Sequence, residues 1–230
     1  MQGVRQPNDR SMVPDEVDQN LIDAFPASDP PSRTLGTDHV AAGSGAAARK
    51  ALQESREMFR LSREVHEGDH VQGEPSAAVT LLMYGAYECP YCVEGNMIVK
   101  KIQGHFGDEL RFVFRHFPRT DVHPHAEAAA EVAEAAGEQG RFWEMHDLLF
   151  ENYNRLDGEH LLAYASGLGL DMERFDQAIV SRKFSSRVRE DLVSGIESGV
   201  KGTPTYFING VKYNRSGELD VLLAAIRDAH

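Results

Sequence analysis

Apolar and polar residues alternate in two different patterns between residues 77 and 117. The run from 77 to 87 is apolar, partly β-branched and short, which predicts a buried strand. Val93, Met97 and Ile102 then recur at helical spacing, and large apolar residues alternate with basic ones from 110 to 117, as in a second strand. A strand, a helix and a strand in this order predict parallel strands joined by a right-handed crossover.

A long helical block and a short strand pair follow this unit. Apolar residues at helical spacing extend from 125 to 199, with breaks near 137–140, 156–158 and 167–171, which predicts a compact helical subdomain. The segment 205–209 is typical of a strand, 211–213 of a short antiparallel partner, and 218–229 of a closing helix.

The N-terminal part of the chain has a different composition. Residues 1–48 are rich in Pro, Ser, Asp, Gly and Ala, so we expect mostly disorder, with a short helix at 15–25 and a Pro-rich linker or docking element at 25–32. Helix formers between 49 and 64 predict a linker helix within 49–68. The main domain is then 69–230, with a helical insertion at about 123–199.

Charge and hydropathy narrow the function classes. The net charge is −12 and no Lys/Arg-rich run is present, which argues against nucleic-acid binding. No stretch approaches the ~18 apolar residues of a membrane span, so none is expected. The first residues show no apolar segment behind a basic one, so we expect a cytoplasmic location.

The two cysteines are the residues that say most about the chemistry of the chain. Cys89 and Cys92 are separated by only two residues, so a disulfide between them would remove little chain entropy, and reactivity explains the pair better than stability. At the start of a helix, backbone N–H groups and the helix dipole favour a thiolate, and Pro90 fits the first turn. We therefore predict that Cys89 attacks a substrate sulfur and that Cys92 resolves the mixed disulfide.

Half of a zinc site is the alternative interpretation of such a pair. It needs two further ligands, for which His116, His123 and His125 are the candidates. A cysteine pair at a helix start between two strands favours redox chemistry, and we expect no metal.

A second motif lies far along the chain, at Gly202-Thr203-Pro204-Thr205, directly before a predicted strand. A proline entering a buried strand normally interrupts its hydrogen bonding. A cis Thr203–Pro204 bond would leave the preceding backbone free to pair with an extended peptide, and a trans proline at the first strand residue is the alternative. This segment alone does not decide between them.

Four segments together resemble one family. The sequences YECPYC, LRFVFRHFP, DVHPHAEAAAEVAEAAGEQGRFWEMHDLLFE and GVKGTPTYFINGV are similar to DsbA-like thioredoxin domains, particularly those that stand alone in bacteria or are fused behind NhaA-type sodium/proton antiporters. The resemblance covers about 69–230. It implies an α/β thioredoxin fold, with a central mixed β-sheet flanked by helices and an inserted helical subdomain.

The resemblance also implies roles for particular residues. Cys89 is the nucleophile, Cys92 the resolving thiol, and Pro204 a cis-proline packed against them; the substrate-binding positions are Pro90, Tyr91, Thr203 and Pro204. Tyr91 stands where periplasmic members commonly have His, so we expect a weaker oxidant.

Two further residues are candidates for a role at the cysteine motif. Thr203 replaces a Val found in some periplasmic oxidases. Its hydroxyl can form a hydrogen bond near the sulfurs and so change the reduction potential of the cysteine pair. Glu88 is a candidate proton shuttle, with a solvated charge at the helix start as the alternative.

The sequence therefore predicts a thiol-disulfide oxidoreductase that reduces, isomerises or forms disulfides. Beyond its redox-active disulfide we expect no cofactor, with glutathione as an alternative exchange partner. The expected partners are protein or small-molecule thiols and disulfides, and an unidentified reductase or oxidase. The alternatives are a glutathione-dependent isomerase or transferase of the same fold, which the presence of Cys92 disfavours, and a non-enzymatic peptide-binding adaptor.

Overall fold

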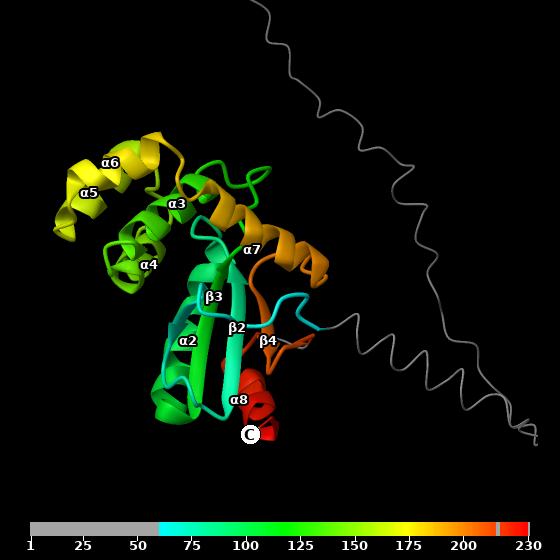
Figure 1. Cartoon of the computed structure of the whole chain (residues 1–230). Helices are drawn as coiled ribbons and strands as arrows, with labels where there is room; N and C mark the ends of the chain where they lie inside the picture. The colour runs from blue at the N-terminus through cyan, green and yellow to red at the C-terminus, as the bar shows by residue number, and fades with distance from the viewer. Residues whose placement is uncertain (1–59, 215–216, 230) are drawn as a thin grey trace, which may run out of the picture. The chain divides into compact units, whose positions relative to one another are not determined.

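The computed structural model describes residues 60–214 and 217–229. A five-stranded sheet has the order β1-β3-β2-β4-β5 (Figure 1). Its strands are β1 (His70–Gln72), β2 (Val79–Gly85), β3 (Leu110–His116), β4 (Thr205–Ile208) and β5 (Val211–Lys212). The sheet is mixed, because β2 and β3 are parallel whereas the β1–β3, β2–β4 and β4–β5 pairs are antiparallel.

Helices surround the sheet and extend beyond one end of it. They are α2 (Pro90–Phe106), the short 3-10 helix η2 (Gly107–Glu109), α3 (Ala126–Gly137), α4 (Phe142–Glu151), α5 (Gly158–Gly167), α6 (Met172–Val180), α7 (Ser185–Glu197) and α8 (Leu219–Asp228). Helices α3 to α7 lie between β3 and β4 in the chain, in the range where the sequence predicts the helical insertion.

The strand–helix–strand unit predicted from the sequence is present. All seven residues of β2 are buried, as its apolar run requires in the middle of a sheet. β2 pairs in parallel with β3, with Leu81 opposite Phe112, and α2 connects the two strands. Because the redox motif follows β2 directly, this crossover places it at the carboxyl ends of the two parallel strands.

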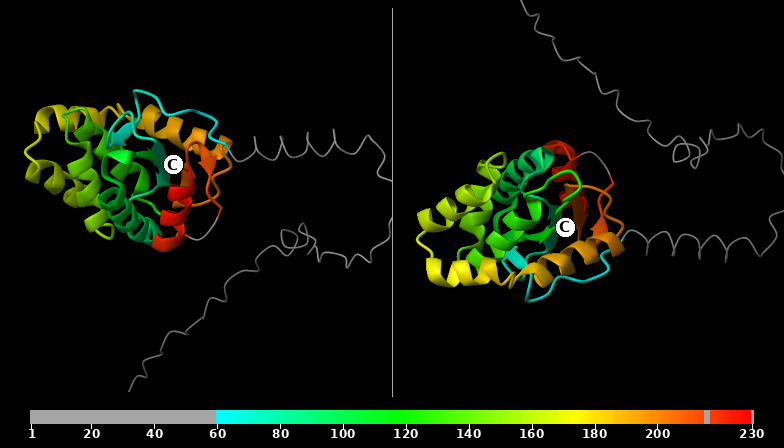
Figure 2. Two further views of the ribbon diagram at one scale, coloured as in Figure 1. Left: turned by 90° about the horizontal axis from the view of Figure 1, so that it is seen from below. Right: turned by 90° about the horizontal axis from the view of Figure 1, so that it is seen from above.

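The alternating side chains of the strands form two cores, one on each face of the sheet. Leu81 and Met83 belong to the larger core, which α2, α8 and the insertion helices complete. Leu82 and Tyr84 point to the other face, where Leu192 of α7 packs. Figure 2 shows α2 and α8 on one side of the sheet and α7 on the other.

The segment before β1 differs from its prediction. The linker helix predicted within 49–68 does not occur over residues 60–68, which are extended or bent. Arg60 instead forms a β-bridge with Val211, and Leu61 N donates to Gly210 O at 2.9 Å. Leu61 and Val65 of this segment pack against the smaller core. The predictions for 1–48, for the helix at 15–25 and for 49–59 lie outside the described residues.

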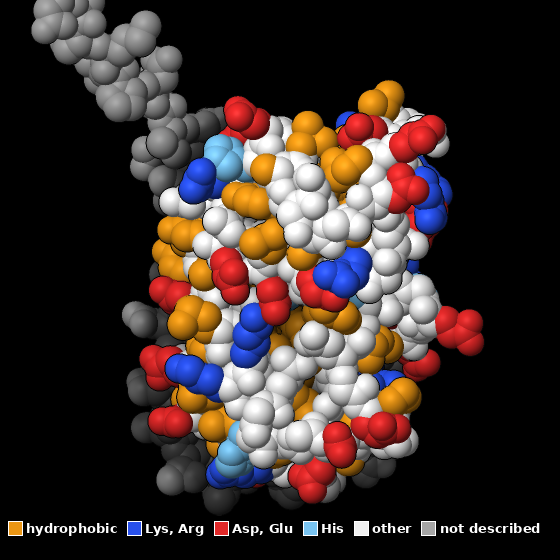
Figure 3. Space-filling view, turned by 90° about the vertical axis from the view of Figure 1, so that its left-hand side faces the viewer, with side chains coloured by type: hydrophobic (Ala, Val, Ile, Leu, Met, Phe, Trp, Pro, Cys, Tyr) orange, Lys and Arg blue, Asp and Glu red, His pale blue; other side chains and the backbone are white. Residues whose placement is uncertain are grey.

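On the face drawn in Figure 3, charged side chains of both signs are interspersed with apolar ones. Within the described part of the chain, no helix combines the length and apolar character needed to cross a membrane.

Candidate functional site

Cys89 is the N-cap residue of α2. Its backbone is extended (φ −86°, ψ 117°), and Pro90 occupies the first turn of the helix, where a missing N–H costs no intrahelical hydrogen bond. Cys92 N donates to Cys89 O at 2.9 Å, so the second cysteine lies one turn further on. Both cysteines are free thiols, and both are buried.

The two sulfur atoms have different surroundings. The Cys89 thiol donates to the Thr203 carbonyl oxygen at 3.5 Å, whereas the Cys92 sulfur accepts from Ala86 N, also at 3.5 Å. The Cys89 sulfur therefore faces the loop that contains Pro204, and the Cys92 sulfur faces the end of β2.

These surroundings separate the acidities of the two thiols. The hydrogen bond from Cys92 lowers the pKa of Cys89 to about 5 against the opposing effect of burial, with help from the Thr203 side chain and from backbone N–H groups of Tyr91 and Cys92. Burial, and then the adjacent Cys89 thiolate, raise the pKa of Cys92 well above its ordinary value. At neutral pH the pair therefore consists of a Cys89 thiolate and a Cys92 thiol.

The loop before β4 reaches this motif. The Thr203–Pro204 peptide bond is cis. Pro204 lies against α2, since its Cγ is 3.3 Å from the position that a Cβ of Gly95 would take. The structure thus brings the Cys89–Cys92 pair together with Thr203 and Pro204, although the two segments are far apart in sequence.

A groove of about 590 Å³ opens beside the motif. Tyr91, Thr203 and Pro204 line it, together with residues of α2, β4, β5 and the approach to α8. Tyr91 is 69% exposed, so its ring is available to a bound molecule. Pro90 is exposed as well, but it does not line this groove.

Glu88 makes contacts away from the sulfur atoms. Its carboxylate accepts hydrogen bonds from His125 N at 2.7 Å and from His125 Nδ1 at 2.8 Å. Because His125 is the N-cap residue of α3, this pair ties the redox motif to the insertion. The proton-shuttle role of Glu88 stays a prediction.

One group of side chains among the described residues has the composition of a metal site. His70, His116 and Glu134 offer ligand atoms that all lie within 4.8 Å of one another. However, Glu134 Oε1 already pairs with His70 Nε2 at 2.9 Å and with His116 Nε2 at 3.0 Å. The Glu134 carboxylate therefore bridges the two imidazole rings. His123 and His125, which the sequence offered as zinc ligands, are not part of it.

Sequence reasoning missed two groups near the motif. Buried His146 pairs with the Tyr87 hydroxyl at 3.2 Å and with Asn96 Oδ1 at 3.3 Å, and burial keeps its pKa well below the ordinary value. The Tyr206 hydroxyl is buried two residues after Pro204. Helical spacing identifies His146 and strand spacing identifies Tyr206 only as core positions, so neither pattern signals chemistry.

The family model described as Thioredoxin matches residues 65–228. The chain belongs to this thioredoxin family. The match includes the redox motif, the whole insertion and the Thr203–Pro204 loop.

Curated relatives carry this domain as part of a longer protein. The chain is 45% identical over 161 residues to a protein named Na(+)/H(+) antiporter NhaA 1 from Salinispora arenicola, which covers 70% of the chain and 24% of that relative. The chain thus spans about a quarter of the length of such relatives. The predicted similarity to antiporter-fused domains is confirmed.

Solved structures confirm the DsbA-like fold. BdbD from Bacillus subtilis superposes with a TM-score of 0.65 at 24% identity, covering 74% of this chain and 97% of that one. A thioredoxin-like oxidoreductase from Silicibacter pomeroyi DSS-3 gives a TM-score of 0.64 at 23% identity, covering 71% and 93%. The predicted fold class, a mixed sheet flanked by helices, is therefore correct.

Proposed function

We propose that the chain is a dithiol–disulfide oxidoreductase in which Cys89 is the nucleophile and Cys92 the resolving thiol. The observation that carries the proposal is the placement of the two sulfur atoms, with Cys89 at the N-cap of α2 facing the Thr203 carbonyl and Cys92 fully buried one turn further on. In keeping with this placement, the pKa of Cys89 is lowered to about 5 and that of Cys92 is raised. A thiolate, and not a thiol, attacks a disulfide, so Cys89 is the sulfur that is ready to react at neutral pH.

In the reductive direction the cycle has two displacements. The Cys89 thiolate attacks one sulfur of a substrate disulfide, which forms a mixed disulfide and releases the other substrate sulfur as a thiolate. Cys92 then loses its proton to solvent base and attacks the Cys89 sulfur. The Cys89–Cys92 disulfide forms, the second substrate thiolate leaves and takes up a proton, and the substrate has gained two electrons. Oxidation of a substrate dithiol is the reverse sequence.

The groove beside Tyr91 and Pro204 supports a polypeptide or a small disulfide as the substrate. Thr203 lines this groove and its carbonyl oxygen is 3.5 Å from the Cys89 sulfur, so an extended segment bound in the groove would pass close to the attacking atom.

Two features favour opposite directions of electron flow. A pKa of about 5 for Cys89 stabilises the dithiol form at neutral pH, because the disulfide form has no thiolate to stabilise, and this favours substrate oxidation. The cytoplasmic location expected from the sequence favours reduction. The reduction potential decides between them.

The test compares the wild type with Cys89→Ser and Cys92→Ser in the reduction of a model protein disulfide, with the potential measured in glutathione buffers. We expect no turnover from Cys89→Ser, and from Cys92→Ser a trapped mixed disulfide visible by mass spectrometry. Full activity of Cys89→Ser would show that the mechanism is wrong.

A further inference from the structure

The hydroxyl of Tyr206 is a buried polar group without a hydrogen-bond partner among the described residues. Tyr206 is only 4% exposed, and it lies on β4 opposite Met83 of β2, within the larger core. An unpaired hydroxyl destabilises a folded protein, because the hydrogen bond it makes with water in the unfolded state is not replaced. Such a group in a native structure calls for an explanation, and a redox role is one of the recognised kinds.

A second feature accompanies the hydroxyl. A Cβ at Gly95 would lie 2.5 Å from the Tyr206 hydroxyl oxygen, a separation that two unbonded atoms do not reach. Gly95 is in the interior of α2, where glycine costs helix stability relative to alanine. The unpaired Tyr206 hydroxyl and the helical Gly95 both lower stability, and they lie at the same place. Because Gly95 has no side chain, it leaves space for the hydroxyl.

This point is adjacent to the resolving cysteine. Gly95 follows Cys92 by three residues on α2, so the two lie on the same side of the helix. Burial, and then the charge of a Cys92 thiolate, raise the pKa of Tyr206, so the phenol keeps its proton. Tyr206 is therefore a hydrogen-bond donor at neutral pH and not a base.

We propose that the Tyr206 hydroxyl donates a hydrogen bond to the Cys92 sulfur as it becomes a thiolate, and so promotes resolution of the mixed disulfide. Cys92 is fully buried, and the long contact from Ala86 N and the Thr203 side chain only partly offset the effect of burial on its pKa. A buried thiolate needs donors that water does not supply. The unpaired hydroxyl finds its acceptor only at this step.

The proposal rests on the proposed function and assigns a residue to its second displacement. The bonds that form and break are unchanged. The proton of Cys92 still goes to solvent base, because Tyr206 donates a hydrogen bond and does not give up its proton.

The two displacements can be followed as two separate phases when the protein reacts with an excess of the aryl disulfide 5,5′-dithiobis(2-nitrobenzoate). Attack by Cys89 releases one coloured aryl thiolate, and attack by Cys92 on the resulting mixed disulfide releases a second. In Tyr206→Phe we expect the first phase to keep its rate and the second to slow about three- to tenfold, since the lost hydrogen bond raises the pKa of the attacking thiol while increasing its nucleophilicity.

Tyr84→Phe is the matched control for removal of a buried phenol hydroxyl from this sheet. The Tyr84 hydroxyl contacts Ser194 Oγ at 2.8 Å and Arg115 Nη1 at 3.1 Å, so its loss lowers stability and leaves both phases at wild-type rates. Tyr206→Phe, by contrast, keeps or gains stability to urea, because it removes an unpaired group.

Gly95→Ala tests the position of the hydroxyl. The added methyl group displaces it, so the second phase slows when residue 206 is Tyr, and a much smaller effect is expected in the Tyr206→Phe background. A wild-type second phase in Tyr206→Phe overturns the proposal, and so does equal slowing of both phases. Release of a single aryl thiolate by the wild type contradicts the proposed resolving role of Cys92 itself.

Discussion

Two identical side chains at this site have opposite properties because of their positions. Cys89 is the N-cap residue of α2 and receives hydrogen bonds from its neighbours, whereas Cys92 lies one turn inside the helix and is fully buried. The helix start alone predicted a reactive Cys89, and the contacts show that Cys92 and Thr203 add to its effect.

Thr203→Val tests the contribution of the Thr203 side chain. That side chain lowers the pKa of Cys89 by hydrogen bonding, so its removal should raise the midpoint of thiolate formation above about 5. Absorbance of the thiolate at about 240 nm, followed against pH, measures this midpoint.

Thr80→Val is the control for this substitution. It removes a hydroxyl that accepts from Arg111 Nε at 2.7 Å near the start of β2, away from the cysteines, and should leave the Cys89 midpoint unchanged. An unchanged midpoint in Thr203→Val would show that the backbone donors and Cys92 suffice.

At the scale of elements, one carboxylate joins the insertion to the sheet. Glu134 is on α3, and its two histidine partners are on β1 and β3. These histidine hydrogen bonds outweigh burial and hold the pKa of Glu134 well below its ordinary value of 4.5. The carboxylate therefore stabilises the fold above pH 4.5, and this contribution is lost as the pH falls below it.

Glu134→Gln should lower the free energy of unfolding at pH 7 by about 1–3 kcal/mol, the range for a disrupted buried hydrogen-bond pair. Urea unfolding at several pH values measures the difference from the wild type, which should shrink below pH 4.5. A difference that stays constant with pH would contradict the assignment.

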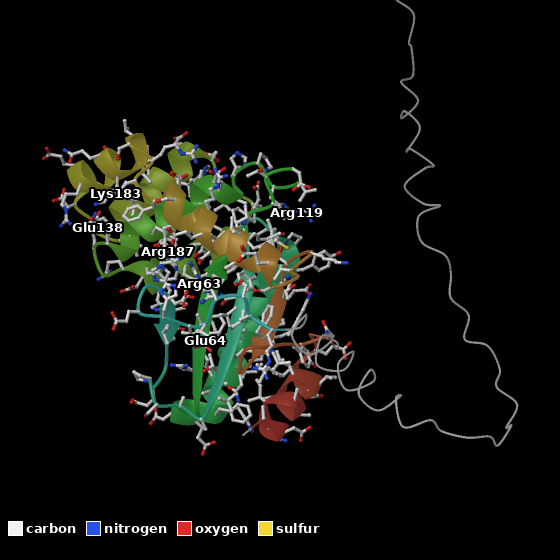
Figure 4. The ribbon with its side chains drawn as sticks, turned by 45° about the vertical axis from the view of Figure 1, so that its right-hand side comes forward. Arg63, Glu64, Arg119, Glu138, Lys183 and Arg187 are labelled. Carbon is white, nitrogen blue, oxygen red and sulfur yellow. The ribbon has the colours of Figure 1, made fainter. Side chains whose placement is uncertain are left out.

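Glu138→Gln is the matched substitution at the end of the same helix. Glu138 pairs with Lys183 at the surface (Figure 4), and exposed ion pairs contribute only about 0–1 kcal/mol. Its effect on unfolding should be small at every pH.

Across the whole molecule, a buried ionic network holds the segment before β1, the sheet and α7 together. Arg115 of β3 donates to both oxygens of Asp69 at 2.9 and 2.8 Å and to the backbone oxygens of Arg63 and Glu64. Asp191 of α7 pairs with Arg63 at 2.6 Å and with Arg187, and Figure 4 shows these two arginines close together beside α7. These charges therefore help to hold the non-helical backbone at 60–68, together with its contacts to β5 and the smaller core.

Arg115→Met should destabilise the protein by about 3–5 kcal/mol, because it leaves the Asp69 carboxylate buried without its partner. Urea unfolding measures the loss. Arg119→Met, which breaks an exposed pair with Asp121, should leave the unfolding midpoint unchanged. Equal effects of the two substitutions would show that the network contributes no more than a surface pair.

The sequence by itself determined the elements whose periodicity is strong. The apolar run of β2, the helical spacing after Cys92 and the strand–helix–strand order were sufficient for the parallel core of the fold, because burial on both faces or on one helical face imposes a recognisable pattern. The position of Cys89 at the start of α2 was predictable for the same reason, since it depends on the local start of a helix.

Only the tertiary structure decided how distant residues combine. Arg115 follows the alternation of β3 as if it faced solvent, yet it is fully buried, because Asp69 supplies a countercharge that no periodicity reveals. The helix predicted at 49–68 is absent over 60–68 because contacts with β5, the smaller core and this network outweigh local propensity. In the sequence, Tyr206 is only an apolar position of a strand. In the structure its hydroxyl lies against Gly95 of α2, next to the turn that carries Cys92. Local spacing does not encode such packing between elements, so nothing in the sequence pattern indicated it.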